Sequence, residues 1–195
     1  THHGAFDFSY LKYIPNLTIM APANETELQD MLNTALTLKN PSVIRYPRGS
    51  GTRVASFQRN FDLLDIGKAK LEKDGTDVYI ICIGNVLQIC LEAANNLQRK
   101  GISVAVLNLR FLKPFDETAV KNILTITNKI VTVEEGSLIG GTGETVKAVL
   151  SGTDAKIVSI GLPDKFIEHG PQNVIRQLCG LSVENIENEV VNLCK

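Results

Sequence analysis

Short apolar runs alternate with helix-forming segments through most of the sequence, and this alternation limits the fold more than any other feature. The runs are rich in Val and Ile, as buried strands are, and the segments between them carry apolar residues at helical spacing. The expected strands are 77–83, 103–109, 130–134 and 156–160, and the expected helices are 86–99, 116–125, 144–150, 172–178 and 183–193. Strands separated by helices are typical of a parallel sheet that is covered on both faces. We therefore expect an α/β fold with a mixed, mostly parallel sheet and helices on both faces.

The first sixty residues have a different organisation. Residues 17–20 and 42–46 read as strands, and a helix is expected to begin at Asn24, with Glu27 placed as in a capping box. Two strands and one helix bury too little surface to form a domain, so this part is expected to be the tail of a larger α/β domain. Residues 49–62 are polar and without period, as a linker is. We therefore expect two parts, residues 1–58 and 59–195.

Charge and composition exclude several classes of protein. The 195 residues include 20 Lys and Arg against 21 Asp and Glu, and the net charge of -1 provides no field that would attract a nucleic acid. No apolar run approaches the roughly 18 residues of a membrane-spanning helix. The four cysteines form no C-x-x-C pair and are expected to be reduced, which favours a cytosolic or organellar compartment. We expect a soluble protein that binds neither nucleic acid nor membrane.

The N-terminus has the character of a cut. The chain starts at Thr1 rather than Met, and neither a charged segment nor the apolar core of a signal peptide follows. The adjacent His2 and His3 could also be the remnant of an expression tag. We expect a truncation before Thr1.

Two motifs in the second part could carry chemistry. The Gly-rich stretch 140–143 precedes a helix, where phosphates bind, but it lacks the spacing of a phosphate-binding loop and has acidic neighbours, so a structural turn is favoured. Glu134 and Glu135 end a strand and could hold a metal or transfer a proton. The interpretation that we favour is a helix-dipole contact, or an ion pair with a cation across an interface.

Histidine and arginine residues in the loops are the remaining candidates. His169 beside a glycine is expected to be an ordinary solvated histidine, whereas His2 and His3, next to Gly4, are suited to proton transfer near neutral pH. The residues alone leave open which of the two would act. Arg45 and Arg48 bracket a Pro-fixed turn, so a guanidinium presented there could bind phosphate or make a surface ion pair.

A series of motifs runs along the sequence, and the most specific of them is Arg45-Tyr46-Pro47-Arg48-Gly49. On this segment the sequence is similar to the C-terminal portion of 1-deoxy-D-xylulose-5-phosphate synthases, and the similarity extends over essentially the whole chain. It also includes Thr1-His2-His3-Gly4-Ala5-Phe6-Asp7, Ile14-Pro15-Asn16, Met20-Ala21-Pro22, Ile66-Gly67-Lys68-Ala69, Arg110-Phe111-Leu112-Lys113-Pro114, Val131-Thr132-Val133-Glu134-Glu135-Gly136, Gly140-Gly141-Thr142-Gly143 and Gly161-Leu162-Pro163-Asp164. The later motifs are partly shared with transketolases and 2-oxoacid dehydrogenase β subunits.

This resemblance implies an enzyme that joins pyruvate, after decarboxylation, to glyceraldehyde 3-phosphate on thiamine diphosphate and Mg²⁺, for isoprenoid, thiamine and pyridoxal synthesis. It implies that His2 contacts substrate and transfers protons, that Arg48 binds the phosphate of the aldehyde, and that Arg45 is structural. It also implies a transketolase-like C-terminal domain, preceded by the end of a pyrimidine-binding domain. The residues that bind the cofactor and the metal would precede Thr1. We therefore expect this chain alone to be inactive and to bind neither.

Other functions remain open at this point. The parent could be a transketolase or a 2-oxoacid dehydrogenase β subunit, or the part from about residue 63 could serve only dimerisation, with the Gly-rich loop and the glutamate pair at a subunit contact. A nucleotide-binding regulatory domain that uses residues 140–143 is a weaker alternative. The resemblance further implies a homodimer, in the cytoplasm of a bacterium or in a plastid.

Overall fold

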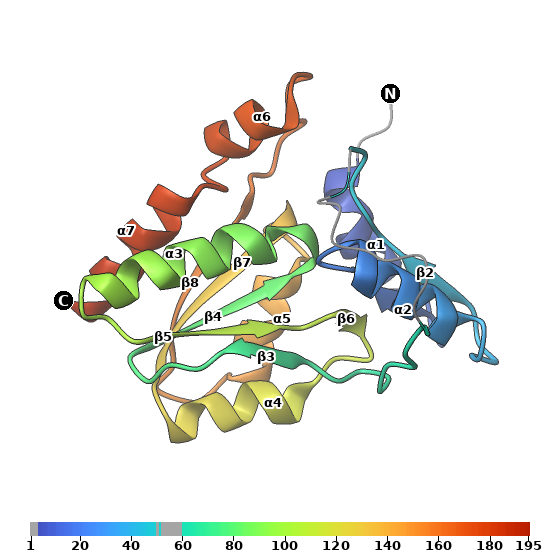
Figure 1. Cartoon of the computed structure of the whole chain (residues 1–195), viewed down its shortest axis with the longest axis horizontal. Coiled ribbons are helices and arrows are strands. Elements are labelled where there is room, and N and C mark those ends of the chain that lie inside the picture. Colours follow the sequence, from blue (N-terminus) through green and yellow to red (C-terminus); the bar gives the residue numbers. More distant parts are fainter. Residues whose placement is uncertain (1–3, 50, 52–59) are drawn as a thin grey trace.

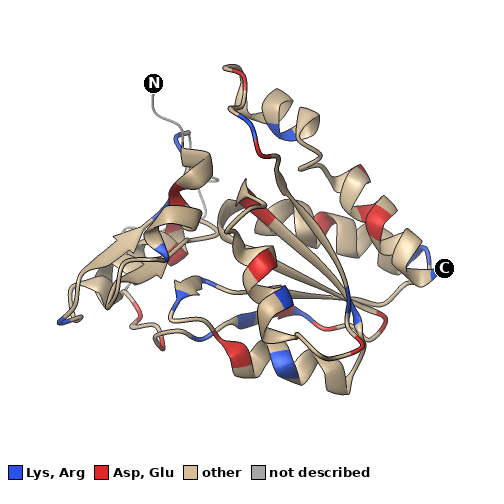
Figure 2. Ribbon diagram, turned by 180° about the vertical axis from the view of Figure 1, so that it is seen from behind, with Lys and Arg blue, Asp and Glu red and all other residues tan. Residues whose placement is uncertain are grey.

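The computed structural model describes residues 4–49, 51 and 60–195. His2 and His3, and most of the expected linker, therefore lie outside the described residues. Figure 1 shows a larger body built round a five-stranded sheet, with the N-terminal segment packed against one end of it. In Figure 2, acidic and basic residues are interspersed along both parts of the described chain.

The main sheet has the expected mixed, mostly parallel character. Its strand order is β3-β5-β4-β7-β8, and only β3 runs antiparallel to its neighbour. The strands are β3 (Lys70–Lys73), β4 (Val78–Ile83), β5 (Val104–Asn108), β7 (Lys129–Ser137) and β8 (Lys156–Leu162). β4 is buried along its whole length because it lies in the middle of the sheet, which explains its continuous apolar sequence. The expected fold class is confirmed.

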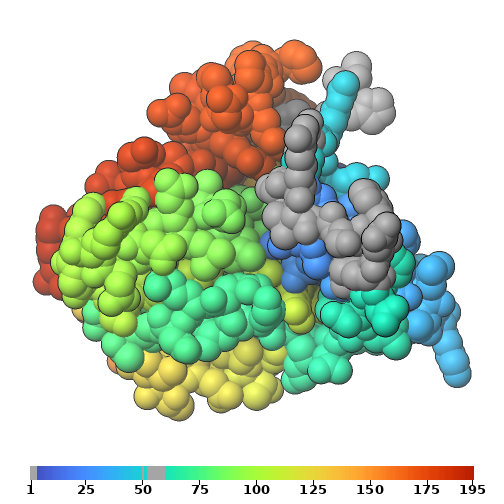
Figure 3. Space-filling view, viewed as in Figure 1, coloured from blue at the N-terminus to red at the C-terminus, as the bar shows by residue number. Residues whose placement is uncertain are grey.

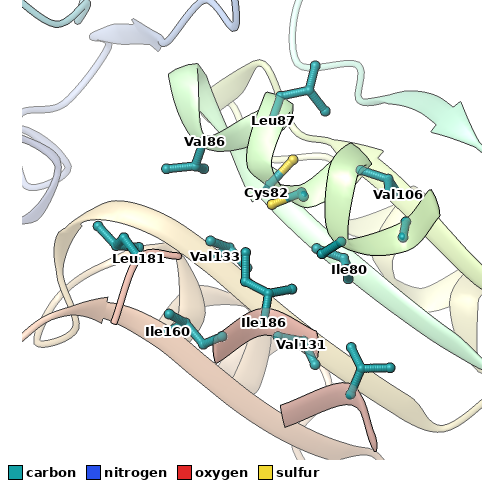
Figure 4. Close-up of a cluster of buried hydrophobic side chains, with 14 of the residues drawn as sticks. Ile80, Cys82, Val86, Leu87, Val106, Val131, Val133, Ile160, Leu181 and Ile186 are labelled. Carbon is teal, nitrogen blue, oxygen red and sulfur yellow. The ribbon is translucent and has the colours of Figure 1, made fainter. Parts of the chain in front are cut away.

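Helices cover both faces of this sheet, and the hydrophobic core therefore consists of two clusters, one on each face. On one face α3 (Leu87–Arg99) and α7 (Val183–Cys194) enclose the first hydrophobic cluster. Figure 4 shows this cluster, with Ile80 and Val131 from the strands beside Ile186 from α7. On the other face, α4 (Glu117–Asn122) and α5 (Thr142–Val149) pack on residues such as Ile81. Neighbouring strand residues enter different clusters because successive side chains of a strand point to opposite faces.

The N-terminal part forms a second, smaller sheet that includes a strand of the larger body. Its elements are the 3-10 helix η1 (Gly4–Phe6), α1 (Asp7–Leu11), β1 (Thr18–Met20), α2 (Glu25–Ala35) and β2 (Ser42–Ile44). β1 pairs in parallel with β2 and antiparallel with β6 (Phe111–Lys113). The two expected parts are therefore joined by main-chain hydrogen bonds. The sequence predicted β1, α2 and β2 but missed α1, β3 and β6.

The expected cap of α2 is present in a modified form. The Asn24 side chain accepts a hydrogen bond from the backbone N of Glu27 at 2.9 Å. The Glu27 carboxylate accepts from the backbone N of Ala23 at 2.7 Å, instead of from Asn24 as a capping box requires. In α2 Met31 is fully buried, whereas Leu32 and the C-cap residue Leu36 are 55% and 80% exposed.

Three further elements complete the described chain. The short helices η2 (Gly84–Val86) and η3 (Ile123–Thr125) precede α3 and follow α4, and α6 (Gln172–Leu178) precedes α7. All four cysteines are free thiols, as expected. Among the residues that the structure describes, no helix is both long and apolar enough to cross a membrane.

Candidate functional site

A cavity of about 330 Å³ lies where the N-terminal part meets the larger body. Gly4 and Arg45 line it from the N-terminal part, and Glu135, His169 and Arg176 line it from β7, the loop after β8 and α6. In Figure 3 the segment after β2 (cyan) and the orange segment that includes α6 both lie at the top of the view. The cavity therefore adjoins two segments that the sequence singled out, the one after His2–His3 and the one before Arg48.

The structure places Arg48 at the surface, three residues after Arg45 of the cavity wall. Arg48 is exposed in the segment that follows β2, and it makes no hydrogen bond or ion pair with the described residues. Arg45, three residues earlier, has only 14% of its side chain exposed and is held by several contacts. The two arginines of the motif thus have different environments, because Arg48 is exposed and Arg45 is held by contacts within the fold.

Glu135 organises the charged wall of the cavity. Arg176 donates to its carboxylate through two nitrogens, Nε to Oε1 at 3.1 Å and Nη2 to Oε2 at 2.7 Å. Arg45 Nη2 donates to the Glu135 backbone oxygen at 3.0 Å, and its Nη1 lies 3.8 Å from Oε2. Burial raises the pKa of Glu135, but the hydrogen bonds and charge of Arg176, with the charge of Arg45, bring it below the ordinary value. Glu135 is therefore held as a carboxylate by cations from two distant segments.

Glu134, the preceding residue, occupies the N-terminus of α5. Its carboxylate accepts hydrogen bonds from the backbone N of Thr142 at 2.8 Å and of Gly143 at 2.9 Å. Burial raises the pKa of Glu134, although the hydrogen bonds from Gly143 and Thr142 act to lower it. Both favoured interpretations of the glutamate pair have a counterpart in the structure, because Glu134 meets a helix N-terminus and Glu135 meets one cation, Arg45, across the contact between the two parts.

The Gly-rich stretch exists because the helix end approaches Glu134 closely. A Cβ atom on Gly141 would lie 2.5 Å from Glu134 Oε1 and 2.3 Å from the Ser137 backbone oxygen. A Cβ atom on Gly143 would lie 2.7 Å from the hydroxyls of both Thr132 and Ser159. The stretch is a structural turn, as expected. The alternative of a nucleotide site there is disfavoured, since the N–H groups of Thr142 and Gly143 that would bind phosphate already donate to Glu134.

The N-terminal helix α1 rests on the same Gly-rich loop. Lys12 Nζ donates to the Gly141 backbone oxygen and to Thr145 Oγ1, both at 3.0 Å. Ser9 Oγ donates to the Ile139 backbone oxygen at 2.8 Å. These contacts fix the N-terminal part against the larger body, and no sequence pattern predicted them.

Neither a metal-binding cluster nor an unoccupied N-terminus of α5 is present among the described residues. No group of three or more His, Cys, Asp or Glu side chains is placed to hold a metal within the described ranges. The N-terminus of α5, the feature most similar to a phosphate site, is filled by Glu134. His169 lines the cavity but is exposed, as a solvated loop histidine is.

Family models match both parts of the chain. The transketolase C-terminal domain matches residues 67–186, and the transketolase pyrimidine binding domain matches residues 1–53. Among solved structures, the chain is similar to a protein described as "Split gene transketolase, inactive beta4 tetramer", with a TM-score of 0.82 and 27% identity. That similarity covers 96% of this chain and 60% of the other.

Curated relatives carry a more specific name. The 1-deoxy-D-xylulose-5-phosphate synthase of Desulforudis audaxviator is 41% identical over 95% of this chain and 30% of its own length. The protein of the same name from Halothermothrix orenii is 45% identical over 88% of this chain and 27% of its own length. The chain thus spans about 30% of the length of these relatives. With both transketolase models matched, one of them over more than half of its residues, the chain belongs to the transketolase C-terminal domain family.

Proposed function

We propose that the chain is the C-terminal part of a 1-deoxy-D-xylulose-5-phosphate synthase. Its parent would join pyruvate, with decarboxylation, to glyceraldehyde 3-phosphate, for isoprenoid, thiamine and pyridoxal synthesis. The observation that carries this proposal is the 41% identity to a curated synthase over 95% of the chain. The alternative is a transketolase parent, which the name of the structural neighbour favours at the lower identity of 27%. A 2-oxoacid dehydrogenase β subunit is a further alternative.

The chain would contribute substrate contacts, and the rest of the parent would hold the cofactor. Thiamine diphosphate with Mg²⁺ supplies the chemistry of decarboxylation and carbon transfer when it is bound. We place its binding residues outside this chain, because the described residues offer no metal-binding group and the N-terminus of α5 is filled by Glu134. The chain alone would be inactive.

The proposed division of the chain follows the family models. Residues 1–58 would be the end of the pyrimidine-binding domain with its linker, and residues 59–195 would be the C-terminal domain. The gap between the two matched ranges, 1–53 and 67–186, supports a boundary in this region. The pairing of β6 with β1 means that the two domains would not be independent bodies.

His2 and Arg48 are the proposed functional residues. Arg48 would bind the phosphate of glyceraldehyde 3-phosphate, a role supported by its exposure and its lack of partners among the described residues. A planar guanidinium can donate two hydrogen bonds to one phosphate. His2 would contact substrate and transfer protons; it lies two positions before Gly4, which lines the cavity.

The parent is further proposed to be a homodimer in a bacterial cytoplasm or a plastid. Large apolar side chains are exposed on both parts of the described chain, among them Tyr13 at 81%, Leu36 at 80% and Phe166 at 82%. Exposed apolar groups of this size favour association with another protein surface. A role in dimerisation is compatible with a role in the enzyme.

Replacing Arg48 with alanine in the intact parent tests this function. We expect the KM for glyceraldehyde 3-phosphate to rise about 10- to 100-fold, because hydrogen bonds to charged groups are worth about 1.5–3 kcal/mol. The KM for pyruvate should change less than about threefold, since pyruvate carries no phosphate. Steady-state kinetics with each substrate varied in turn measures both values.

The matched control is Lys147→Ala, which removes an exposed cation from α5. It should leave both KM values unchanged. Equal increases of both KM values in the Arg48→Ala protein would contradict the phosphate role of Arg48. A parent that forms no 1-deoxyxylulose 5-phosphate would contradict the proposed reaction itself.

A further inference from the structure

The middle of the segment that presents Arg48 makes few contacts. The segment leaves the small sheet at the end of β2 and comprises Arg45-Tyr46-Pro47-Arg48-Gly49. Tyr46 is 62% exposed and Arg48 is exposed, and neither makes a hydrogen bond with the described residues. The contacts that determine the position of the Arg48 guanidinium must therefore be made by the two ends of the segment, not by Tyr46 and Arg48.

The start of the segment is fixed by Arg45. Its backbone N donates to the Met20 backbone oxygen at 2.8 Å, which extends the pairing of β2 with β1 by one hydrogen bond. Its guanidinium donates to the Glu135 backbone oxygen at 3.0 Å and stacks over the Phe8 ring at 5.2 Å. The Glu135 carboxylate is 3.8 Å away, so the buried guanidinium lies beside a counter-charge.

The end of the segment approaches the same carboxylate. A Cβ atom built on Gly49 would lie 4.0 Å from Gln172 Oε1, so Gly49 packs against the first residue of α6. Gln172 Nε2 in turn lies 3.4 Å from Glu135 Oε1, a long hydrogen bond. Arg176, one turn later on α6, fixes the Glu135 carboxylate through its two-nitrogen contact. Glu135 is thus connected to the start of the segment through Arg45 and to its end through Gln172.

We propose that Glu135 is a positioning residue that sets the place of Arg48 and so tunes the site for a phosphorylated aldehyde. It acts through Arg45 and Gln172 and does not touch the substrate. The identity of the substrate rests on the proposed function. That Glu135 holds the segment in place rests only on the contacts described above. Pro47 transmits the position, because its ring fixes one backbone dihedral between Arg45 and Arg48.

The test is Glu135→Gln in the intact parent enzyme. Glutamine retains the backbone oxygen and one side-chain acceptor but removes the charge that both guanidinium groups face. We expect the KM for glyceraldehyde 3-phosphate to rise about 3- to 10-fold, with kcat and the KM for pyruvate changed less than twofold. A role in stability alone would lower the amount of folded enzyme without this selective change.

A double-mutant cycle isolates the route through Arg48. If Glu135 acts by positioning Arg48, then Glu135→Gln should have no further effect on the KM for the aldehyde in the Arg48→Ala background. An undiminished increase in that background would overturn the proposal, as would an unchanged KM in the single variant while Arg48→Ala raises it. The control is Glu144→Gln, an exposed carboxylate on α5 that should change neither KM.

Hydrogen exchange of the Arg45 amide separates this proposal from the proposed function. In Glu135→Gln the bond from Arg45 N to Met20 should open more often, and exchange should be at least about fivefold faster than in wild type. If Arg48→Ala leaves the KM for the aldehyde unchanged, the phosphate role fails and this exchange rate alone decides the positioning role. Faster exchange then supports it, and unchanged exchange overturns it.

Discussion

Replacing Glu134 with glutamine should destabilise the fold through the N-terminus of α5. In the native protein the two carboxylate oxygens each accept one backbone N–H, from Thr142 at 2.8 Å and from Gly143 at 2.9 Å. Glutamine offers a single acceptor oxygen, and its amide nitrogen faces the second N–H, donor against donor. One of the two buried N–H groups therefore loses its partner.

The expected decrease in the free energy of unfolding follows from this one unpaired N–H group. A buried N–H without a partner costs about 1–3 kcal/mol. Burial also disfavours the charge of Glu134, as the direction of its pKa shift indicates, so neutralising the group offsets part of the cost. The expected net loss in the free energy of unfolding is about 1–2 kcal/mol at pH 7. With a urea m value of about 2 kcal/mol per molar, the unfolding midpoint should fall by about 0.5–1 M.

Urea unfolding followed by far-UV circular dichroism measures this change. The control is Glu144→Gln, because Glu144 is exposed and accepts a hydrogen bond from the Gly140 backbone N at 2.8 Å at the same helix end. Its loss should cost no more than about 0.5 kcal/mol. A Glu134→Gln protein as stable as wild type would refute the reasoning that this carboxylate caps α5.

The stabilities of wild type and Glu134→Gln should also depend differently on pH. Because the pKa of Glu134 is raised by burial above its ordinary value of 4.5, the folded protein binds this proton more readily than the unfolded chain does. The contribution of Glu134 to stability is then fully present below pH 4.5 and decreases as the pH rises through the folded pKa. The stability difference between wild type and Glu134→Gln should therefore be larger at acidic pH than at pH 7. Other carboxylates affect both proteins alike and cancel.

Two further predictions concern the helix cap and the cofactor. Asn24→Ala removes the cap of α2 and should lower the free energy of unfolding by about 1 kcal/mol. The control Asn40→Ala, at an exposed turn, should lower it by less than about 0.5 kcal/mol. Equal losses in urea unfolding would contradict the role of Asn24 as a cap. Isothermal titration calorimetry of this chain with thiamine diphosphate and Mg²⁺ should show no tight binding, and binding in the micromolar range would contradict the placement of the cofactor residues outside it.

The sequence predicted the body of the fold because its strands and helices carry their own signals. β4 lies in the middle of the sheet and is apolar throughout, and α3 has a regular apolar face, so local patterns were sufficient there. β3 and β6 were missed for a physical reason. β3 is a charged strand at the sheet edge, and β6 has only three residues, so each owes its structure to its partner strand. Such elements are set by tertiary contacts that a local pattern does not contain.

The candidate site also has residues that the sequence could predict and residues that it could not. Arg48 stands in a motif that the sequence displays, so it could be named in advance. The cluster round Glu135 could not, because its hydrogen bonds join residues 90 positions apart for Arg45 and 41 positions apart for Arg176. No spacing rule connects such residues. Only the folded arrangement of β2, β7 and α6 brings them together.

Glu134 and Glu135 show why identical neighbours can acquire different roles. Successive side chains of a strand point to opposite faces, so Glu134 faces α5 while Glu135 faces the cavity and α6. Burial disfavours the charge of both carboxylates. Two guanidinium groups reverse that effect at Glu135, whereas peptide N–H groups do not fully reverse it at Glu134. Loss of the carboxylate should therefore appear in stability at Glu134 and in substrate affinity at Glu135, a separation that the two Gln variants test side by side.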